Sequence, residues 1–165
     1  MQTAIRKQVK VDLSAEKAFN TFVNGLTLWW PKAYTWSKDK LTEISIHPVP
    51  GGHCMEKGPN DFRCDWGTVS AVKRSEYITI KWQISPFRVP EPDPLKASEV
   101  TIRFRAMHDG QTVVELRHDH FENHGDGHEE YRKAMDSSQG WEYILACFAV
   151  RARKGNGTTT AEVAF

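Results

Sequence analysis

The fold of this chain is decided by one stretch near its C-terminal end, which reads DGHEEYRKAMDSSQGWEYILACFAVRAR at positions 126–153. The residues of its repeating face recur at intervals of three and four, which is the pattern of a helix with one broad apolar side. Asp126 and Glu129 resemble a capping pair, and Gly155 is a natural stop. We therefore expect one long helix, which needs a large surface to pack against. The repeating face consists of Tyr131, Met135, Ser138, Trp141, Leu145, Phe148 and Ala152.

The chain before this helix supplies that surface, because its apolar and polar residues alternate as in half-buried strands. Ile5 to Leu13 predicts a first strand, and two short helices follow, the first capped by Ser14 and the second stopped by Pro31. Leu41 to His120 predicts about six further strands, interrupted by a proline-rich loop at Ser85 to Lys96. The expected fold class is α+β, a helix-grip arrangement in which a curved antiparallel sheet of about seven strands holds the long helix.

The composition limits the classes of partner. The 165 residues suffice for one domain, which we expect to span 1–154, followed by a flexible tail at 155–165. Lys and Arg (22) nearly balance Asp and Glu (21), so no charged field favours nucleic acid or an anionic membrane. The polar segment Gln2 to Lys10 lacks the apolar core of a signal peptide, and we expect a cytoplasmic protein.

The cysteines agree with a reducing compartment. Cys54, Cys64 and Cys147 are an odd number without metal-type spacing, which argues against a disulfide framework. A disulfide between Cys54 and Cys64 across a hairpin is the minority alternative, because disulfide geometry is strict. We expect no cofactor, and the sequence does not indicate the oligomeric state.

Several short motifs resemble a known superfamily. The motifs are Trp29-Trp30-Pro31, Pro50-Gly51-Gly52, Asp65-Trp66-Gly67, Trp82-Gln83-Ile84, Ser98-Glu99-Val100 with Phe104, Leu116-Arg117-His118 with Phe121, and Gly140-Trp141 ahead of Leu145. In their order and spacing they are similar to the START-like (SRPBCC, Bet v 1-like) superfamily, and within it to the AHSA family, named for homology to the activator of the Hsp90 chaperone ATPase. The resemblance covers Val9 to about Arg153.

This resemblance implies an apolar cavity between the sheet and the long helix, but it does not imply one activity. Related members bind lipids, hormones or polyketides, and some act as cyclases. The eukaryotic chaperone activator carries a separate N-terminal domain, which we do not expect in this chain because its strand pattern begins at Ile5. Transfer of the chaperone activity is therefore doubtful.

Aromatic side chains are the first candidates for a binding site. As cavity lining they would bury a planar or aliphatic ligand and orient it with an indole N–H, whereas the alternative is that they are ordinary core. The residues that we expect to bind a ligand are Trp30, Trp66, Trp82, Phe104, His118 and Trp141, with Trp29 and Trp36 in the wider aromatic set.

A histidine cluster, His118, His120, His124 and His128, is the second candidate. Alternate residues on a strand face the same way, so His118 and His120 could share a zinc or nickel ion with the other two. Against this, no Cys or carboxylate stands at a defined spacing, and the loop is expected to be exposed. We predict no metal site.

His118 also continues an apolar strand face. There it could orient a ligand or act as a general acid or base, with Glu56, Asp65 or Glu115 as its partner. A histidine in such a place is more often a hydrogen-bonded structural residue, so both interpretations stay open.

Three hypotheses about function follow. The first is a non-enzymatic protein that binds a small hydrophobic or aromatic molecule in the cavity. The second is an enzyme of the cyclase, aromatase or hydrolase type that uses the same cavity. The third is a stress-related or chaperone-associated interaction protein with a protein partner. The sequence has no nucleophile motif, phosphate-binding loop or dinucleotide fingerprint.

Overall fold

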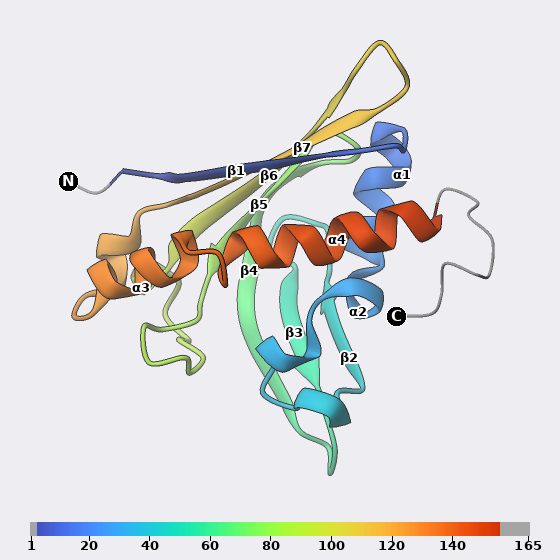
Figure 1. The fold of residues 1–165 in the computed structure, drawn as a ribbon. Coiled ribbons are helices and arrows are strands. Elements are labelled where there is room, and N and C mark those ends of the chain that lie inside the picture. The colour runs from blue at the N-terminus through green and yellow to red at the C-terminus, as the bar shows by residue number, and fades with distance from the viewer. Residues whose placement is uncertain (1–2, 156–165) are drawn as a thin grey trace.

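The computed structural model describes residues 3–155, which form one antiparallel sheet and the helices that cover it. The sheet has seven strands in the order β1-β7-β6-β5-β4-β3-β2. It curls around the C-terminal helix α4 (Figure 1), so the predicted helix-grip class is confirmed. The strands are β1 (Ile5–Val11), β2 (Glu43–Ile46), β3 (His53–Lys57), β4 (Arg63–Lys73), β5 (Tyr77–Trp82), β6 (Ser98–Ala106) and β7 (Thr112–Asp119).

Short helices connect β1 to β2. Ser14 caps the first of them as predicted, because its Oγ accepts a hydrogen bond from the Lys17 amide at 3.2 Å. Thr27 Oγ1 then ties the second to β2 by donating to the carbonyl of Ile44 at 2.7 Å. The helices of this segment are α1 (Ala15–Phe19), the π-helical turn η1 (Asn20–Asn24), α2 (Leu26–Trp29) and the 3₁₀ turns η2 (Lys32–Tyr34) and η3 (Lys38–Lys40).

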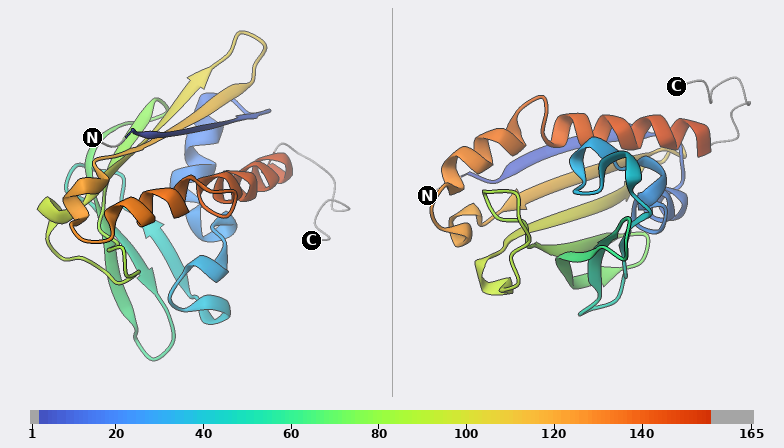
Figure 2. Two further views of the ribbon diagram at one scale, coloured as in Figure 1. Left: turned by 60° about the vertical axis from the view of Figure 1, so that its left-hand side comes forward. Right: turned by 90° about the horizontal axis from the view of Figure 1, so that it is seen from below.

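The long helix that we expected over 126–153 is instead two helices, α3 (His128–Asp136) and α4 (Trp141–Gly155), which follow the 3₁₀ turn η5 (Phe121–His124). The chain is extended at Ser137, whose hydroxyl donates to the Ala134 carbonyl at 2.6 Å and so ends α3. The predicted capping role of Asp126 is wrong, because α3 begins at a glycine N-cap without a side-chain bond. The two helices lie in sequence across one face of the sheet (Figure 2).

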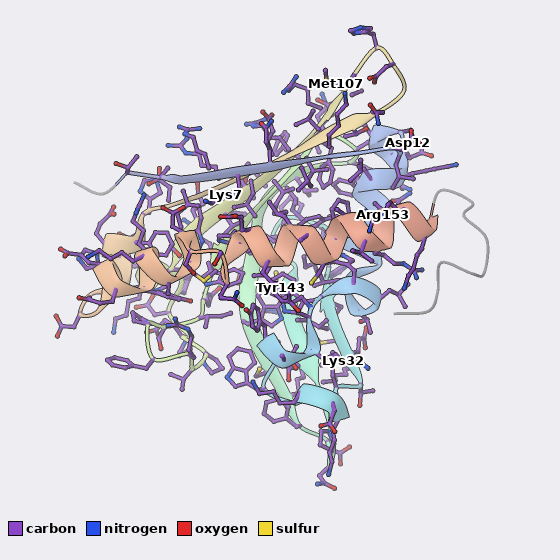
Figure 3. All side chains as sticks on the ribbon, viewed as in Figure 1. Lys7, Asp12, Lys32, Met107, Tyr143 and Arg153 are labelled. Carbon is purple, nitrogen blue, oxygen red and sulfur yellow. The ribbon has the colours of Figure 1, made fainter. Side chains whose placement is uncertain are left out.

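Gly140 permits the close turn between these helices. A Cβ atom placed there would lie 2.2 Å from the carbonyl oxygen of Met135, which no real side chain tolerates. Lys7 of β1 then holds both sides of the break, with its Nζ 3.0 Å from Asp136 Oδ1 and 3.5 Å from Glu142 Oε2 (Figure 3). Specific contacts therefore hold the four residues 137–140 in the conformation that separates α3 from α4.

The hydrophobic core fills the centre of the curved sheet. Phe148 of α4 packs against Phe22 at a ring distance of 4.9 Å, and Phe22 packs against Phe104 of β6 at 5.8 Å. Side chains occupy the space between α4 and the strands (Figure 3). Whatever space remains for a ligand therefore lies away from the middle of α4.

The loops and cysteines follow from the strand register. The proline-rich segment after β5 is a loop as predicted, with a single bridge between Ile84 and Pro90 and one 3₁₀ turn, η4 (Pro94–Lys96). Cys54 faces Gly67 across the ladder and Cys64 faces Glu56, so the alternative Cys54–Cys64 disulfide is not formed and both thiols are free. No helix within residues 3–155 has the length and apolar character needed to cross a bilayer. The tail predicted from 155 lies outside the described residues, apart from Gly155 at the end of α4.

Candidate functional site

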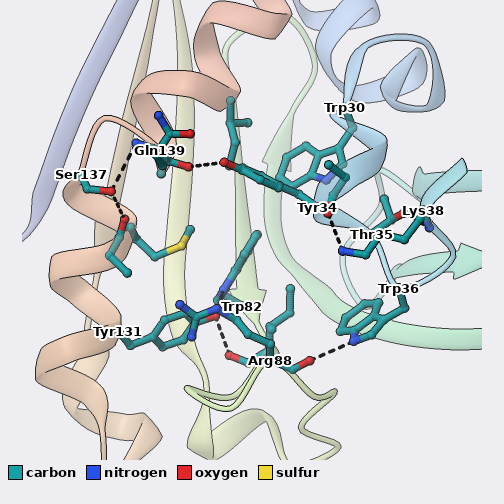
Figure 4. A pocket seen from close by; sticks show the side chains of 16 residues that line it. Trp30, Tyr34, Thr35, Trp36, Lys38, Trp82, Arg88, Tyr131, Ser137 and Gln139 are labelled. Atoms are coloured by element: carbon teal, nitrogen blue, oxygen red, sulfur yellow. Dashed lines mark hydrogen bonds between the residues drawn. The ribbon is translucent and has the colours of Figure 1, made fainter.

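A pocket of about 520 Å³ opens beside α3, at the end of the curved sheet where the helix is interrupted (Figure 4). Its first wall is the segment 30–38, and its second is formed by α3, the break at 137–140 and Ile144 of α4. The end of β5 and the loop after it close the pocket with Trp82, Ile84 and Arg88. The break between α3 and α4 thus supplies part of the pocket wall, because Ser137, Gln139 and Gly140 line it.

Aromatic rings dominate the lining, and most of their polar atoms are bonded within the protein. Trp82 Nε1 donates to Tyr131 Oη at 2.7 Å, and this hydroxyl donates to the Ile84 carbonyl at 2.9 Å. Trp36 Nε1 donates to the Arg88 carbonyl at 2.9 Å. With these atoms satisfied, the rings present apolar surface to the pocket, which suits a flat apolar ligand.

Two hydrogen bonds join the segment 30–38 to the opposite sides of the pocket. Tyr34 Oη donates to the Gln139 carbonyl at 2.7 Å, so this tyrosine spans from the first wall to the break between the helices (Figure 4). The bond from Trp36 to Arg88 joins the same segment to the loop after β5. Both bonds are exposed to solvent, and each net contribution is therefore of the order of 1 kcal/mol.

A buried carboxylate sets the position of Trp36. Glu56 of β3 is fully buried, and its Oε1 accepts the Trp36 amide at 3.1 Å. Its Oε2 accepts both the amide and the hydroxyl of Ser37 at 2.7 Å each. Three donors around one carboxylate hold this part of the pocket wall against β3.

The charged groups of the lining are cationic, and its buried phenol is neutral. Burial raises the pKa of Tyr131, whose hydroxyl therefore stays protonated at neutral pH and can donate a hydrogen bond. The Arg88 guanidinium lies over the Tyr131 ring, 4.5 Å from its centroid. Lys38 is the other cation of the lining, and its Nζ donates to the Ala33 carbonyl at 2.6 Å.

Two of the six predicted ligand-binding residues, Trp30 and Trp82, line this pocket. Trp66 lies behind them, with its ring centre 6.3 Å from that of Trp30, and Trp141 lies 5.3 Å from Trp82. Phe104 packs deeper, 5.3 Å from Phe19 under α1. The indole N–H groups of Trp30 and Trp66 are buried without a hydrogen-bond partner in the described chain.

The sixth predicted residue, His118, is fully buried in a hydrogen-bond chain next to the aromatic rings. Trp141 Nε1 lies 2.9 Å from His118 Nδ1, and His118 Nε2 lies 2.7 Å from Ser98 Oγ. Ser98 Oγ in turn lies 2.7 Å from His124 Nε2. This chain links α4, β7, β6 and η5. None of the partners proposed for His118 from the sequence, Glu56 among them, takes part in it.

The donors and acceptors of this chain fix both imidazole tautomers. An indole nitrogen can only donate, so His118 Nδ1 accepts and its proton sits on Nε2. That Nε2–H donates to Ser98 Oγ, whose own hydroxyl hydrogen is then directed to His124 Nε2. Burial lowers the pKa of His118 well below its usual value and that of His124 to about 4, so both rings are neutral at neutral pH. Both ring nitrogens of His118 are thus occupied by the protein.

The other two histidines of the predicted cluster lie apart from this chain. His120 is exposed, with its Nδ1 3.5 Å from Glu122 Oε2, and His128 begins α3 with its Nδ1 buried and without a hydrogen-bond partner. Within residues 3–155 no group of three or more His, Cys, Asp or Glu side chains is arranged to hold a metal ion.

Several residues of the pocket lining and of the hydrogen-bond chain beside it were not among the sequence candidates. Tyr131 and Met135 were assigned to the packed face of the long helix, where they do pack against the core, and both also line the pocket. Arg88 lies in the proline-rich loop, which has no periodic signal that could place it. Ser98 was recognised only as part of a short motif, and its role depends on two histidines more than 19 residues away in the sequence.

Comparison with known proteins finds the fold in solved structures. No family model matches the chain, and no curated protein matches it. The anthrahydroquino-gamma-pyrone synthase Txn09, solved as a complex, is 29% identical over 90% of this chain and 96% of its own, with a TM-score of 0.64.

Two further structures show the same fold at lower identity. The self-sacrificing resistance protein CalC from Micromonospora echinospora is 24% identical over 94% of this chain and 97% of its own, with a TM-score of 0.66. The Aha1 dimer from Colwellia psychrerythraea is 16% identical over 94% of this chain and 100% of its own, with a TM-score of 0.61. These likenesses show the helix-grip fold and are consistent with the START-like superfamily, while the AHSA family stays a prediction.

Proposed function

We propose that this protein binds a small, flat, apolar or aromatic molecule in the pocket between α3, the segment 30–38 and the end of β5. The observation that carries the proposal is the lining itself, in which Trp30, Trp36 and Trp82 converge with Tyr34 and Tyr131. The volume of about 520 Å³ falls in the range of sites for small molecules. The polar atoms of four of these rings are already bonded within the protein, all but that of Trp30, so these rings lose little when a ligand displaces water from their faces.

The six residues predicted from the sequence take two roles in this proposal. Trp30 and Trp82 contact the ligand, because they line the pocket. Trp66, His118 and Trp141 form the layer behind them and hold the two rings in place through packing and through the hydrogen-bond chain, while Phe104 packs deeper in the core.

A second candidate function is an enzyme of the cyclase type that uses the same pocket. The 29% identity to the synthase Txn09 over 90% of the chain favours it. In that case Tyr131 is the group that we expect to act, as a hydrogen-bond donor to an oxygen of the precursor, because its protonated hydroxyl lies beside the Arg88 guanidinium and can exchange the Ile84 carbonyl for the substrate. Conversion of a bound aromatic precursor that is lost in Tyr131→Phe, with binding retained, would establish this role.

We also propose that the protein belongs to the AHSA family and lies in the cytoplasm. The free thiols of Cys54, Cys64 and Cys147 agree with a reducing compartment. The likeness to the Aha1 dimer, at 16% identity, supports the fold alone, so the chaperone-associated hypothesis gains no argument from it.

Titration with methylnaphthalene, a neutral flat aromatic, tests the binding proposal through the intrinsic tryptophan fluorescence. Ala134 is exposed on α3 and lines the pocket, so Ala134→Phe should obstruct it and weaken binding by about tenfold or more. The matched control is Lys133→Phe, which places the same ring one residue away at an exposed position outside the lining. No binding by the unchanged protein, or equal weakening in both variants, would contradict the proposal.

A further inference from the structure

We infer that the pocket selects aromatic molecules that carry an anionic group, such as an aryl carboxylate, and that Arg88 binds this group. The inference rests on the proposed function, which requires only an apolar or aromatic ligand. It adds the charge of the ligand and names the residue that recognises it.

The backbone presents Arg88 at the pocket in a fixed conformation. Arg88 has φ +64, a region that residues other than glycine seldom adopt. Its amide donates to the Ser85 carbonyl at 2.9 Å, and its own carbonyl accepts from Trp36 Nε1. Ser85 also closes the turn through its hydroxyl, which accepts the amides of Phe87 at 3.2 Å and Val89 at 3.4 Å. Unusual backbone that is held this firmly occurs preferentially at ligand-binding sites.

The Arg88 side chain is equally well placed. Its guanidinium lies over the Tyr131 ring (Figure 4). The side chain of the neighbouring Phe87 is 78% exposed. Nη1 donates to the Pro86 carbonyl at 2.6 Å, which uses one of the five N–H donors of the group. Among residues 3–155 no carboxylate forms an ion pair with Arg88. A stacked guanidinium with unused donors is suited to a planar carboxylate, which it can bind through two parallel bonds.

The charge of the whole pocket lining is positive, which also favours an anionic ligand. Of the sixteen lining residues, Lys38 and Arg88 carry charge, both are cations, and none is a carboxylate. An aromatic cation would therefore meet two like charges without a compensating anion. An aromatic anion would place its ring among the tryptophans and its charge at Arg88, near the surface.

Three probes of similar shape test this inference, namely naphthoate, neutral methylnaphthalene and naphthylmethylammonium. We expect naphthoate to bind about tenfold more tightly than methylnaphthalene, since a charge-assisted bond contributes on this scale, and the cation to bind more weakly than either. Added salt should weaken the binding of naphthoate and leave that of methylnaphthalene unchanged.

Two arginine variants locate the effect. Arg88→Gln should abolish the preference for naphthoate, so that the ratio of the two affinities, both measured in the same variant, falls to about one. The matched control is Arg103→Gln, because Arg103 likewise lies over a tyrosine ring, 5.1 Å from the Tyr77 centroid, but does not line the pocket. Arg88→Lys, which keeps the charge and loses the planar fork, should retain part of the preference.

The outcomes separate the two levels of the argument. If naphthoate and methylnaphthalene bind equally, the proposed function stands and the inference about charge is overturned. If the preference for naphthoate survives Arg88→Gln, the assignment to Arg88 is overturned. If none of the three probes binds, both the proposed function and the inference are lost.

Discussion

Replacement of Ser98 by alanine tests the buried hydrogen-bond chain at its centre. The hydroxyl of Ser98 accepts from His118 Nε2 and donates to His124 Nε2, both at 2.7 Å, and the residue is fully buried. Ser98→Ala removes both bonds and changes little else in volume. His118 then keeps its bond from Trp141 and is left with a buried N–H that has no acceptor.

The magnitude follows from which partners remain. A buried donor without an acceptor costs about 1–3 kcal/mol. The loss at His124 is smaller, because the Ser98 amide, which the substitution retains, also donates to His124 Nε2 at 3.3 Å. We therefore expect Ser98→Ala to lower the free energy of unfolding by about 2 kcal/mol.

Urea unfolding followed by circular dichroism measures this change. The control is Ser70→Ala, because Ser70 is exposed and its hydroxyl makes one long bond of 3.3 Å to the Thr79 carbonyl. We expect the control to stay within about 0.5 kcal/mol of the unchanged protein. Nitrogen NMR of the unchanged protein should also find the proton of His118 on Nε2 and that of His124 on Nδ1. A loss equal to that of the control, or the opposite tautomer at His118, would refute the reasoning.

Three further predictions concern stability and the pocket wall. Burial lowers the pKa of His118 and brings that of His124 from 6.5 to about 4, so below pH 6.5 the unfolded chain binds more protons than the folded one. The contribution of these two groups to the free energy of unfolding should be level above this pH and fall as the pH is lowered toward 4, with half-buried His124 contributing less than its full shift because solvent screens it. A flat urea profile over this range would be inconsistent with two rings that are neutral in the folded state. Glu56→Gln replaces one acceptor oxygen by an NH2 donor that faces the backbone amides of the segment 30–38, and it should lower the free energy of unfolding by about 1–3 kcal/mol and weaken methylnaphthalene binding. Unchanged urea unfolding and ligand titration would show that Glu56 does not support this wall of the pocket. Gly140→Ala forces a Cβ against the backbone of α3 and should cost about 1–3 kcal/mol in thermal or urea unfolding, with a neutral result showing that the break can relax.

The strands and the helix-grip class could be predicted from the sequence because they depend on local periodicity. In β5, for example, Ile78, Ile80 and Trp82 alternate with polar residues, and all three are buried on one face as the period of two requires. Ser14 at the start of α1 is a cap for equally local reasons. Such signals need no knowledge of what lies across the sheet.

The break in the C-terminal helix escaped prediction because its cause is a contact rather than a pattern. The spacing of apolar residues continues through Ser137 and Gly140, whereas the helix stops where the Ser137 hydroxyl bonds Ala134. A cavity with Trp30 and Trp82 was expected, but the part of its wall that this break supplies was not, for the same reason.

Among the aromatic residues, the sequence could indicate burial but not which rings face open space. Trp30 and Trp66 stack on each other and are both buried, yet Trp30 lines the pocket and Trp66 does not. Trp30 belongs to the segment that forms the first wall, whereas Trp66 lies on β4 outside the lining, and this difference is a property of the assembled fold.

The indole N–H spectrum during a titration with methylnaphthalene tests the central claim most directly. The six tryptophans give six signals, and variants in which one tryptophan is replaced assign them. We predict that the largest shifts fall on the three indoles that line the pocket, and the smaller ones on the three that do not. The first group is Trp30, Trp36 and Trp82, and the second is Trp29, Trp66 and Trp141. Saturable shifts that are largest in the second group, or no shift in any signal, would contradict a ligand site in this pocket.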